Sequence, residues 1–67
     1  MNRYHIEVIM NDKKYTRAIV ADGISWSDSG LYEFWITNED GRKQAVAYFP
    51  VYRTIIDTIE YDIIEND

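Results

Sequence analysis

The sequence predicts a single, mainly β domain of about five antiparallel strands in a strongly bent sheet. Runs rich in aromatic and β-branched residues alternate with short polar turns, which is the pattern of strands joined by local reversals. The 67 residues leave room for one core, because a domain of this size buries only about 60% of the surface that its unfolded chain exposes. We therefore expect one domain over residues 1–67, with residues 65–67 frayed.

The clearest element is a β-hairpin over residues 30–50. Two aromatic and β-branched runs flank a polar turn that ends in Asp40-Gly41, and this pair suits the positive φ of a tight hairpin turn. Pro50 ends the second strand. The first strand of this hairpin carries large apolar side chains on both faces, which is typical of a central strand or of one that offers a face to a partner.

A second, local hairpin is expected before it. Residues 4–10 alternate, so that one face of this strand carries Tyr4, Ile6, Val8 and Met10. Residues 11–13 form a turn, because Asn and Asp tolerate left-handed backbone. In the next strand, residues 15–21, one face carries Tyr15, Arg17 and Ile19.

The segment between the two hairpins is short and bounded by turn residues. Ile24 and Trp26 share one side of an extended piece. We expect this piece to fold back under the sheet as a lid on the core. The alternative is that Trp26 is a binding anchor, because Trp supplies a large contact area at low entropic cost.

The segment after Pro50 allows two interpretations. Residues 51–53 suit a single helical turn, and the apolar residues in 54–64 fit both a strand and a helical stripe that starts at Pro50. Residue type favours the strand, because β-branched side chains lose χ1 freedom in a helix and pack well on a pleated sheet. The alternative fold class is α+β with a C-terminal helix.

Five short strands with a helical turn before the last resemble the order of elements in SH3-like and Sm-like small barrels. The resemblance spans most of the chain and lies in this order alone, without a family motif. It implies a small, strongly curved or closed antiparallel sheet.

Charge is unevenly distributed along the chain, whose formal net charge is −5. Residues 1–20 carry four basic and two acidic residues, whereas residues 54–67 carry five acids and no base. Binding a nucleic-acid backbone usually needs clustered cations, which this sequence lacks. A partner with a basic surface suits the acidic end; the alternative is that these acids serve solubility.

Few residues suggest catalysis or metal binding. His5, the single histidine, lies two positions before Glu7 on the same strand face, yet no Ser or Thr stands in a recognisable nucleophile context. One histidine with scattered carboxylates falls short of the ligands of a zinc site. We expect no enzyme activity, no metal and no cofactor.

Location and assembly follow from composition. The chain has no cysteine, so no disulfide supplements the core, and small domains of this kind often gain stability by oligomerising. No apolar run approaches the ~18 residues that a membrane span needs. We expect a cytoplasmic protein with no membrane partner that can form a homo-oligomer.

Aromatic residues are the most informative feature, because ten of them exceed what so small a core needs. The alternative is that most of them form the core. We expect a non-catalytic protein-binding module, plausible as a phage- or mobile-element-encoded inhibitor or adaptor of a host protein. Its candidate binding residues are Trp26, Tyr32, Trp35, Tyr48, Tyr52 and Tyr61, with the acids Asp57, Glu60 and Asp62.

Two other functions stay open. An oligomeric small barrel would bind nucleic acid by stacking on aromatics and by basic residues that flank both hairpin turns and meet at one end. These residues are Lys13, Lys14, Arg17, Arg42 and Lys43. A structural subunit would pair through the edge of the last strand, where Glu60 and Asp62 would guard against unwanted pairing.

Overall fold

The computed structural model describes residues 1–63 and contains two three-stranded antiparallel sheets, with strand orders β2-β1-β6 and β3-β4-β5. The strands and the single 3-10 turn are β1 (Asn2–Met10), β2 (Lys13–Ala21), β3 (Gly23–Trp26), β4 (Leu31–Thr37), β5 (Lys43–Pro50), η1 (Val51–Arg53) and β6 (Thr54–Glu60). The mainly β prediction is confirmed. The strands number six rather than five, and over the described residues the two sheets do not close into a barrel.

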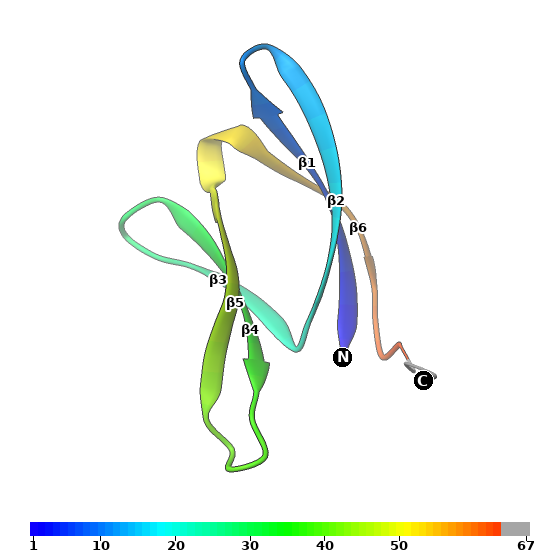
Figure 1. Cartoon of the computed structure of the whole chain (residues 1–67), viewed down its shortest axis with the longest axis vertical. Helices are drawn as coiled ribbons and strands as arrows, with labels where there is room; N and C mark the ends of the chain where they lie inside the picture. Colours follow the sequence, from blue (N-terminus) through cyan, green and yellow to red (C-terminus); the bar gives the residue numbers. More distant parts are fainter. Residues whose placement is uncertain (64–67) are drawn as a thin grey trace.

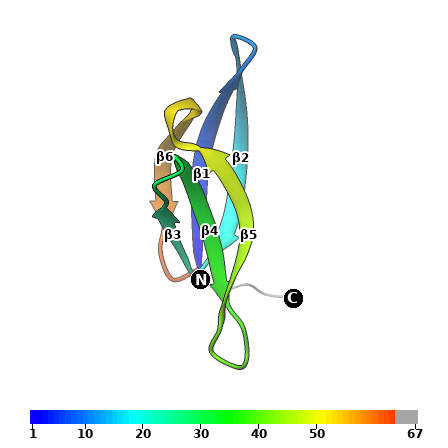
Figure 2. The same cartoon turned by 90° about the vertical axis from the view of Figure 1, so that its left-hand side faces the viewer.

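Each sheet is built around one hairpin, and the two hairpins point in opposite directions. Figures 1 and 2 show the β1–β2 turn at one end of the long axis and the β4–β5 turn at the other. The molecule is elongated and thin, with extents of 39 × 28 × 15 Å. The sheets therefore face each other over only part of their length.

Both predicted hairpin turns are present. Asn11 (φ 50°) and Asp12 (φ 62°) form the two-residue turn between β1 and β2, and positive φ at both positions matches the right-handed twist of the flanking strands. Gly41 has a φ of 83° in the longer β4–β5 turn, a conformation that glycine adopts without steric cost.

The prediction of a lid over residues 24–26 is wrong. This segment is β3, which pairs with β4, because an extended backbone satisfies its N–H and C=O groups best in a ladder. Ile24 lies opposite Phe34 and packs against the core. Trp26 is 74% exposed and meets Tyr32 edge to face, with ring centroids 6.1 Å apart.

The strand prediction after the helical turn is confirmed over Thr54–Glu60, and a helix there is wrong. Ile64 lies outside the described residues. Simple alternation fails within β6, because His5 pairs with Thr58 and its neighbour Ile6 pairs with Ile56. The intervening Asp57 is therefore a bulge residue, and Ile56 and Ile59 both pack against the core.

A second bulge interrupts the predicted alternation of β5. Phe34 lies opposite Ala47, whereas the next residue of β4, Trp35, lies opposite Ala45. Val46 is the extra residue and is 46% exposed. The two alanines consequently lie on different faces of the sheet.

The core lies where the two sheets face each other. Its buried apolar residues are Tyr4, Ile6, Val8, Ala21 and Phe34. The Phe34 ring is fully buried and meets the Tyr4 and Phe49 rings edge to face, at centroid distances of 5.3 and 5.8 Å. The contact with Tyr4 joins β4 to β1 of the other sheet, and the contact with Phe49 joins β4 to β5 within the same sheet.

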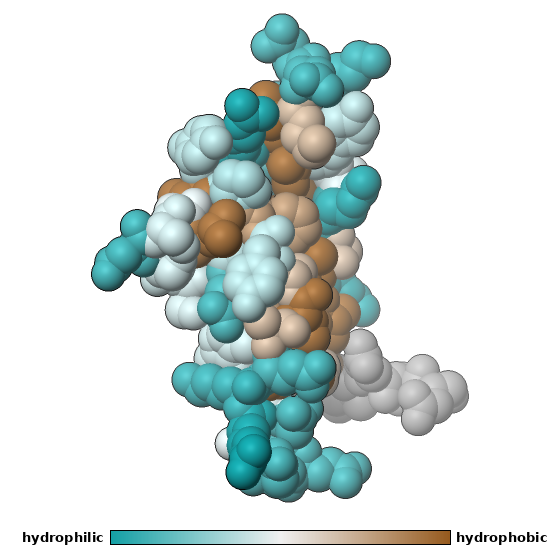
Figure 3. Space-filling view, turned by 60° about the vertical axis from the view of Figure 1, so that its left-hand side comes forward, coloured by the Kyte–Doolittle hydropathy of each residue, from teal (hydrophilic) through white to brown (hydrophobic). Residues whose placement is uncertain are grey.

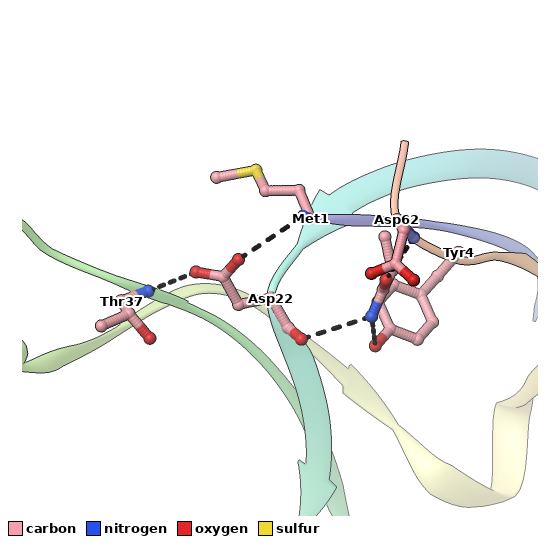
Figure 4. A network of polar contacts seen from close by, with 6 residues as sticks. Met1, Tyr4, Asp22, Thr37 and Asp62 are labelled. Carbon is pink, nitrogen blue, oxygen red and sulfur yellow. Dashed lines mark hydrogen bonds and ion pairs between the residues drawn. The ribbon is translucent and has the colours of Figure 1, made fainter. Parts of the chain in front are cut away.

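Asp22 joins the two sheets where β2 passes into β3 (Figure 4). Its backbone N–H donates to the Trp35 carbonyl at 2.8 Å, and its carboxylate accepts the Thr37 N–H at 2.6 Å. The other carboxylate oxygen lies 3.9 Å from the amino group of Met1, and the Asn2 side-chain amide donates to the Asp22 carbonyl at 3.3 Å. This end of the interface between the sheets is closed by polar contacts.

Candidate binding groove

A groove of about 600 Å³ opens between β1 and β2 on one side and β5 and η1 on the other. Its lining residues are Val8, Met10, Tyr15, Arg17, Tyr48, Phe49, Pro50, Tyr52 and Arg53. The volume lies in the range of sites that bind small molecules or short peptide segments, which are typically concave and mostly apolar with a few polar groups.

The first wall of the groove continues the core-facing row of the β1–β2 sheet. Tyr15 lies directly opposite Val8, and Arg17 lies opposite Ile6, so these side chains project from the same face. Val8 and Ile6 are buried, whereas Tyr15 is 40% exposed. The core-facing row of side chains on β1 and β2 thus continues past the edge of the second sheet, where Tyr15 and Arg17 line the groove.

The second wall is formed where β5 turns into η1. Pro50 has a φ of −63° and directs the chain into the 3-10 turn. Tyr52 then projects at the rim, 81% exposed, with the Arg53 guanidinium 5.5 Å from its ring centroid. Tyr48 on β5 is 58% exposed. The rim therefore carries aromatic rings that are accessible to a ligand.

Among the described residues, the two arginines of the groove have no carboxylate partner. Within residues 1–63, no Asp or Glu oxygen lies within 4.0 Å of Arg17 or Arg53, whereas Arg3 and Arg42 each have one. Arg17 donates only to the neighbouring Thr16 carbonyl, at 2.9 Å. The lining contains no acidic residue, so the groove is locally positive in an acidic protein.

The structure brings together some of the predicted binding aromatics and separates others. Tyr48 and Tyr52 share the groove. Tyr61 lies beyond the end of β6, at the opposite end of that strand from η1 (Figure 1). Tyr15 was missed by the sequence analysis, although its place in the row with Arg17 and Ile19 could have suggested it.

Three predicted aromatics contact other parts of the second sheet. Tyr32 packs against the core and, as described above, meets the exposed Trp26. Trp35 lies opposite Gly23 and covers its α-carbon, and the Lys43 ammonium lies 4.3 Å from its ring centroid. Neither tryptophan lines the groove. Figure 3 shows apolar residues over the middle of one face and hydrophilic residues at both ends.

Of the predicted acids, Glu60 is paired within the chain, whereas Asp57 and Asp62 are exposed and have no ion pair within residues 1–63. Glu60 is held by Arg3 at 3.0 Å and by His5 at 2.9 Å. Hydrogen bonds from His5 and Arg3 lower the pKa of the Glu60 carboxyl below its usual value. Asp57 is exposed at the bulge, and Asp62 lies after β6 with a φ of 54°. The other two acids of the C-terminal end, Glu65 and Asp67, lie outside the described residues.

His5 and the basic residues also differ from the sequence expectations. The carboxylate that bonds to His5 is Glu60, across the strand pair, while Glu7 lies 3.9 Å from Lys14. Lys13 and Lys14 flank the β1–β2 turn, whereas Arg42 and Lys43 flank the β4–β5 turn at the other end of the molecule (Figures 1 and 2). The expected meeting of both basic sets at one end is therefore wrong.

Residues 1–63 contain no group of three His, Cys, Asp or Glu side chains placed to hold a metal ion. In the same part of the chain, no helix is both long and apolar enough to cross a membrane. No family model matches the chain, and no curated protein and no solved structure matches it significantly. The function of the protein is therefore to be inferred from the geometry and chemistry of the groove.

Proposed function

We propose that this protein is a non-catalytic module that binds another protein through the groove between its sheets. One observation carries the proposal: a single concavity is lined by three exposed tyrosines and by two arginines that have no carboxylate partner within residues 1–63. Tyr and Arg are enriched at protein interfaces, where they combine apolar contact with directed hydrogen bonds. Their concentration in one groove favours recognition of a protein ligand.

The chemistry of the lining supports binding rather than catalysis. A general acid–base mechanism needs a group whose pKa lies near the working pH, usually a His, Asp or Glu inside a pocket. The groove residues are tyrosines, arginines and apolar residues, and His5 is not among them. Binding without turnover accounts for this composition.

The finer proposal is a small inhibitor or adaptor, of the phage- or mobile-element-encoded kind, that acts on a cytoplasmic host protein. Small size and the absence of a recognisable catalytic constellation support it. An SH3-like fold is part of the same proposal, supported by the order of elements and by η1 standing before a last strand that pairs with β1.

Affinity capture with groove variants tests the function. Tagged wild-type protein, the double variant Tyr48→Ala/Tyr52→Ala and the control Tyr61→Ala would be incubated with nuclease-treated bacterial lysate. Tyr61 is 68% exposed and does not line the groove, so its variant removes a comparable aromatic surface elsewhere. We expect a stoichiometric protein partner with the wild type and the control, and its loss with the double variant.

Circular dichroism would establish that all three proteins fold alike. A partner retained equally by the double variant would contradict binding through the groove. Partners that are recovered only when the lysate is left without nuclease would contradict the protein-binding proposal.

Nucleic-acid binding is the second candidate, favoured by tyrosines and arginines that line the same groove. Stacking of a base on an aromatic side chain is worth ~1–3 kcal/mol, so few cations are needed for weak binding. Fluorescence anisotropy with labelled single-stranded oligonucleotides at low salt tests this candidate. The absence of binding by both DNA and RNA oligonucleotides under those conditions would remove it.

A further inference from the structure

We infer that the groove recognises an acidic peptide segment, with a carboxylate of the ligand bound by Arg17 and Arg53. The inference rests on the proposed function and specifies the chemistry of its partner. It differs from the sequence expectation, in which the acidic C-terminal end of this chain meets a basic partner. Here the protein supplies the cations and the ligand supplies the negative charge.

The two arginines of the groove are the first reason to expect an acidic ligand. Arg3 and Arg42 lie near Glu60 and Asp40, but Arg17 and Arg53 have no such partner within residues 1–63. Arginine presents a planar fork of donors that matches a carboxylate in two parallel hydrogen bonds. Two such groups in a lining without acids complement a ligand carboxylate.

The apolar part of the lining is the reason to expect apolar side chains in the ligand. Val8 and Phe49 belong to or pack against the core, while Met10 and Pro50 add apolar surface between them and the exposed tyrosines. Aromatic rings and Met accept varied apolar side chains. The matching ligand therefore has apolar side chains next to its carboxylate.

The distribution of charge around the groove favours a peptide over a nucleic acid. Among the described residues, the lining has two cations, and acids lie in the hollows on either side: Asp12 in the one that shares Arg53, and Glu7 and Asp57 in the one that shares Arg17. A nucleic-acid strand carries a phosphate at every nucleotide and would extend past these acids in a protein of net charge −5. A peptide can place one or two carboxylates inside the groove and none beyond it.

Selection from a random dodecapeptide phage library on the wild-type full chain would test the inference. Enriched peptides would be synthesised with a fluorescein label, together with versions in which Gln and Asn replace Glu and Asp. Anisotropy titrations would compare the wild type with Arg17→Gln, Arg53→Gln and the control Arg42→Gln. Arg42 is an exposed arginine on the distant β4–β5 turn.

We expect the enriched peptides to contain more Glu and Asp than the library and to combine them with apolar residues. Each groove variant should weaken binding about tenfold, because a hydrogen bond to a charged group contributes about one factor of ten in affinity. The uncharged peptides should lose affinity for the wild type by a similar factor. The control should bind like the wild type.

The outcomes separate this inference from the proposed function. The peptides would also be titrated against Tyr48→Ala/Tyr52→Ala. Peptides that lose affinity for this double variant but show no acidic enrichment would overturn the inference and leave the proposed protein binding intact. Peptides that bind the double variant as well as the wild type would overturn the inference and the proposed function, and failure to enrich any peptide would overturn the inference. Sedimentation equilibrium that shows a dimer disrupted by Tyr52→Ala would identify a second copy as the occupant instead.

Discussion

The row of side chains that β1 and β2 turn toward the second sheet meets two different environments. Near the β2–β3 junction, Tyr4 is covered by Phe34 and the neighbouring polar groups are bonded. Further along the same face, Tyr15 and Arg17 extend beyond the second sheet into the groove. The same alternation of side chains thus produces a core where it is covered and a candidate binding surface where it is not.

The charged groups of the two regions differ in the same way. At the junction, the Asp22 carboxylate has both the Thr37 N–H and the amino group of Met1 within reach. In the groove, Arg17 and Arg53 have no carboxylate partner among the described residues. The junction carboxylate is thus paired within the chain, whereas the groove arginines have no such pair among residues 1–63.

Removing the central ring of the core should have the largest effect on stability. Phe34→Ala should lower the free energy of unfolding by about 3–5 kcal/mol, because the ring is fully buried and leaves a cavity. Tyr48→Ala in the groove should cost less than about 1 kcal/mol, because that side chain is already largely exposed. Urea denaturation followed by tryptophan fluorescence would measure both.

A domain of this size has little stability to lose, so Phe34→Leu supplies a milder variant that should still fold. Its loss should also exceed that of Tyr48→Ala. Equal losses for the core and groove variants would contradict the distinction between the two regions.

The closed packing near the junction can be broken at Gly23. A Cβ there would collide with the Trp35 ring, so Gly23→Ala should destabilise the protein by about 1–3 kcal/mol. Adding Trp35→Leu to Gly23→Ala should recover part of the loss, because the smaller side chain leaves room. Ser25→Ala, an exposed change in the same strand, is the control. Denaturation of these proteins and of the single variant Trp35→Leu would show whether the two positions are coupled.

The polar part of the junction should contribute less. Asp22→Ala removes the acceptor of the Thr37 N–H and the negative charge near Met1, and should cost about 1–2 kcal/mol. Asp28→Ala removes the same charge from an exposed turn and should change the unfolding midpoint little. Thermal unfolding at neutral pH would compare them. A similar loss in both variants would assign the effect to net charge rather than to the junction.

We expect the smallest effect in the pH dependence of stability, which should come from paired charges such as Glu60 and not from the groove arginines. The pKa of Glu60 is lowered in the folded protein by His5 and Arg3, so its ionised form stabilises the fold above its unfolded pKa. That contribution should disappear as pH falls through the lowered pKa of Glu60 in the folded protein. Thermal midpoints of wild type and Glu60→Gln should therefore differ at neutral pH and converge in acid.

Arg17→Gln sharpens the same comparison. Since Arg17 has no carboxylate partner within the described residues, its variant should keep the acid dependence of the wild type. A flattened pH profile in this variant would show that Arg17 does interact with a titrating group in the folded protein.

The sequence by itself determined the local structure. Alternation and β-branched residues predicted the strands, and Asn11-Asp12 and Gly41 predicted the two hairpin turns, because backbone preferences at these positions depend on neighbouring residues. The same alternation placed Tyr15, Arg17 and Ile19 on one face, as observed. Of the residues that line the candidate groove, it named Tyr48 and Tyr52 from their aromatic type and Arg17 as a basic residue of the nucleic-acid alternative.

The tertiary structure decided which of these faces became core and which became groove. The bulges at Val46 and Asp57 change the register of two strand pairs, and β3 joins a separate sheet rather than covering the first. These features depend on how distant segments pack, for example on His5 reaching Glu60 across the strand pair. The groove exists because the second sheet ends before the row on β1 and β2 does, and no local pattern specifies where a distant strand stops.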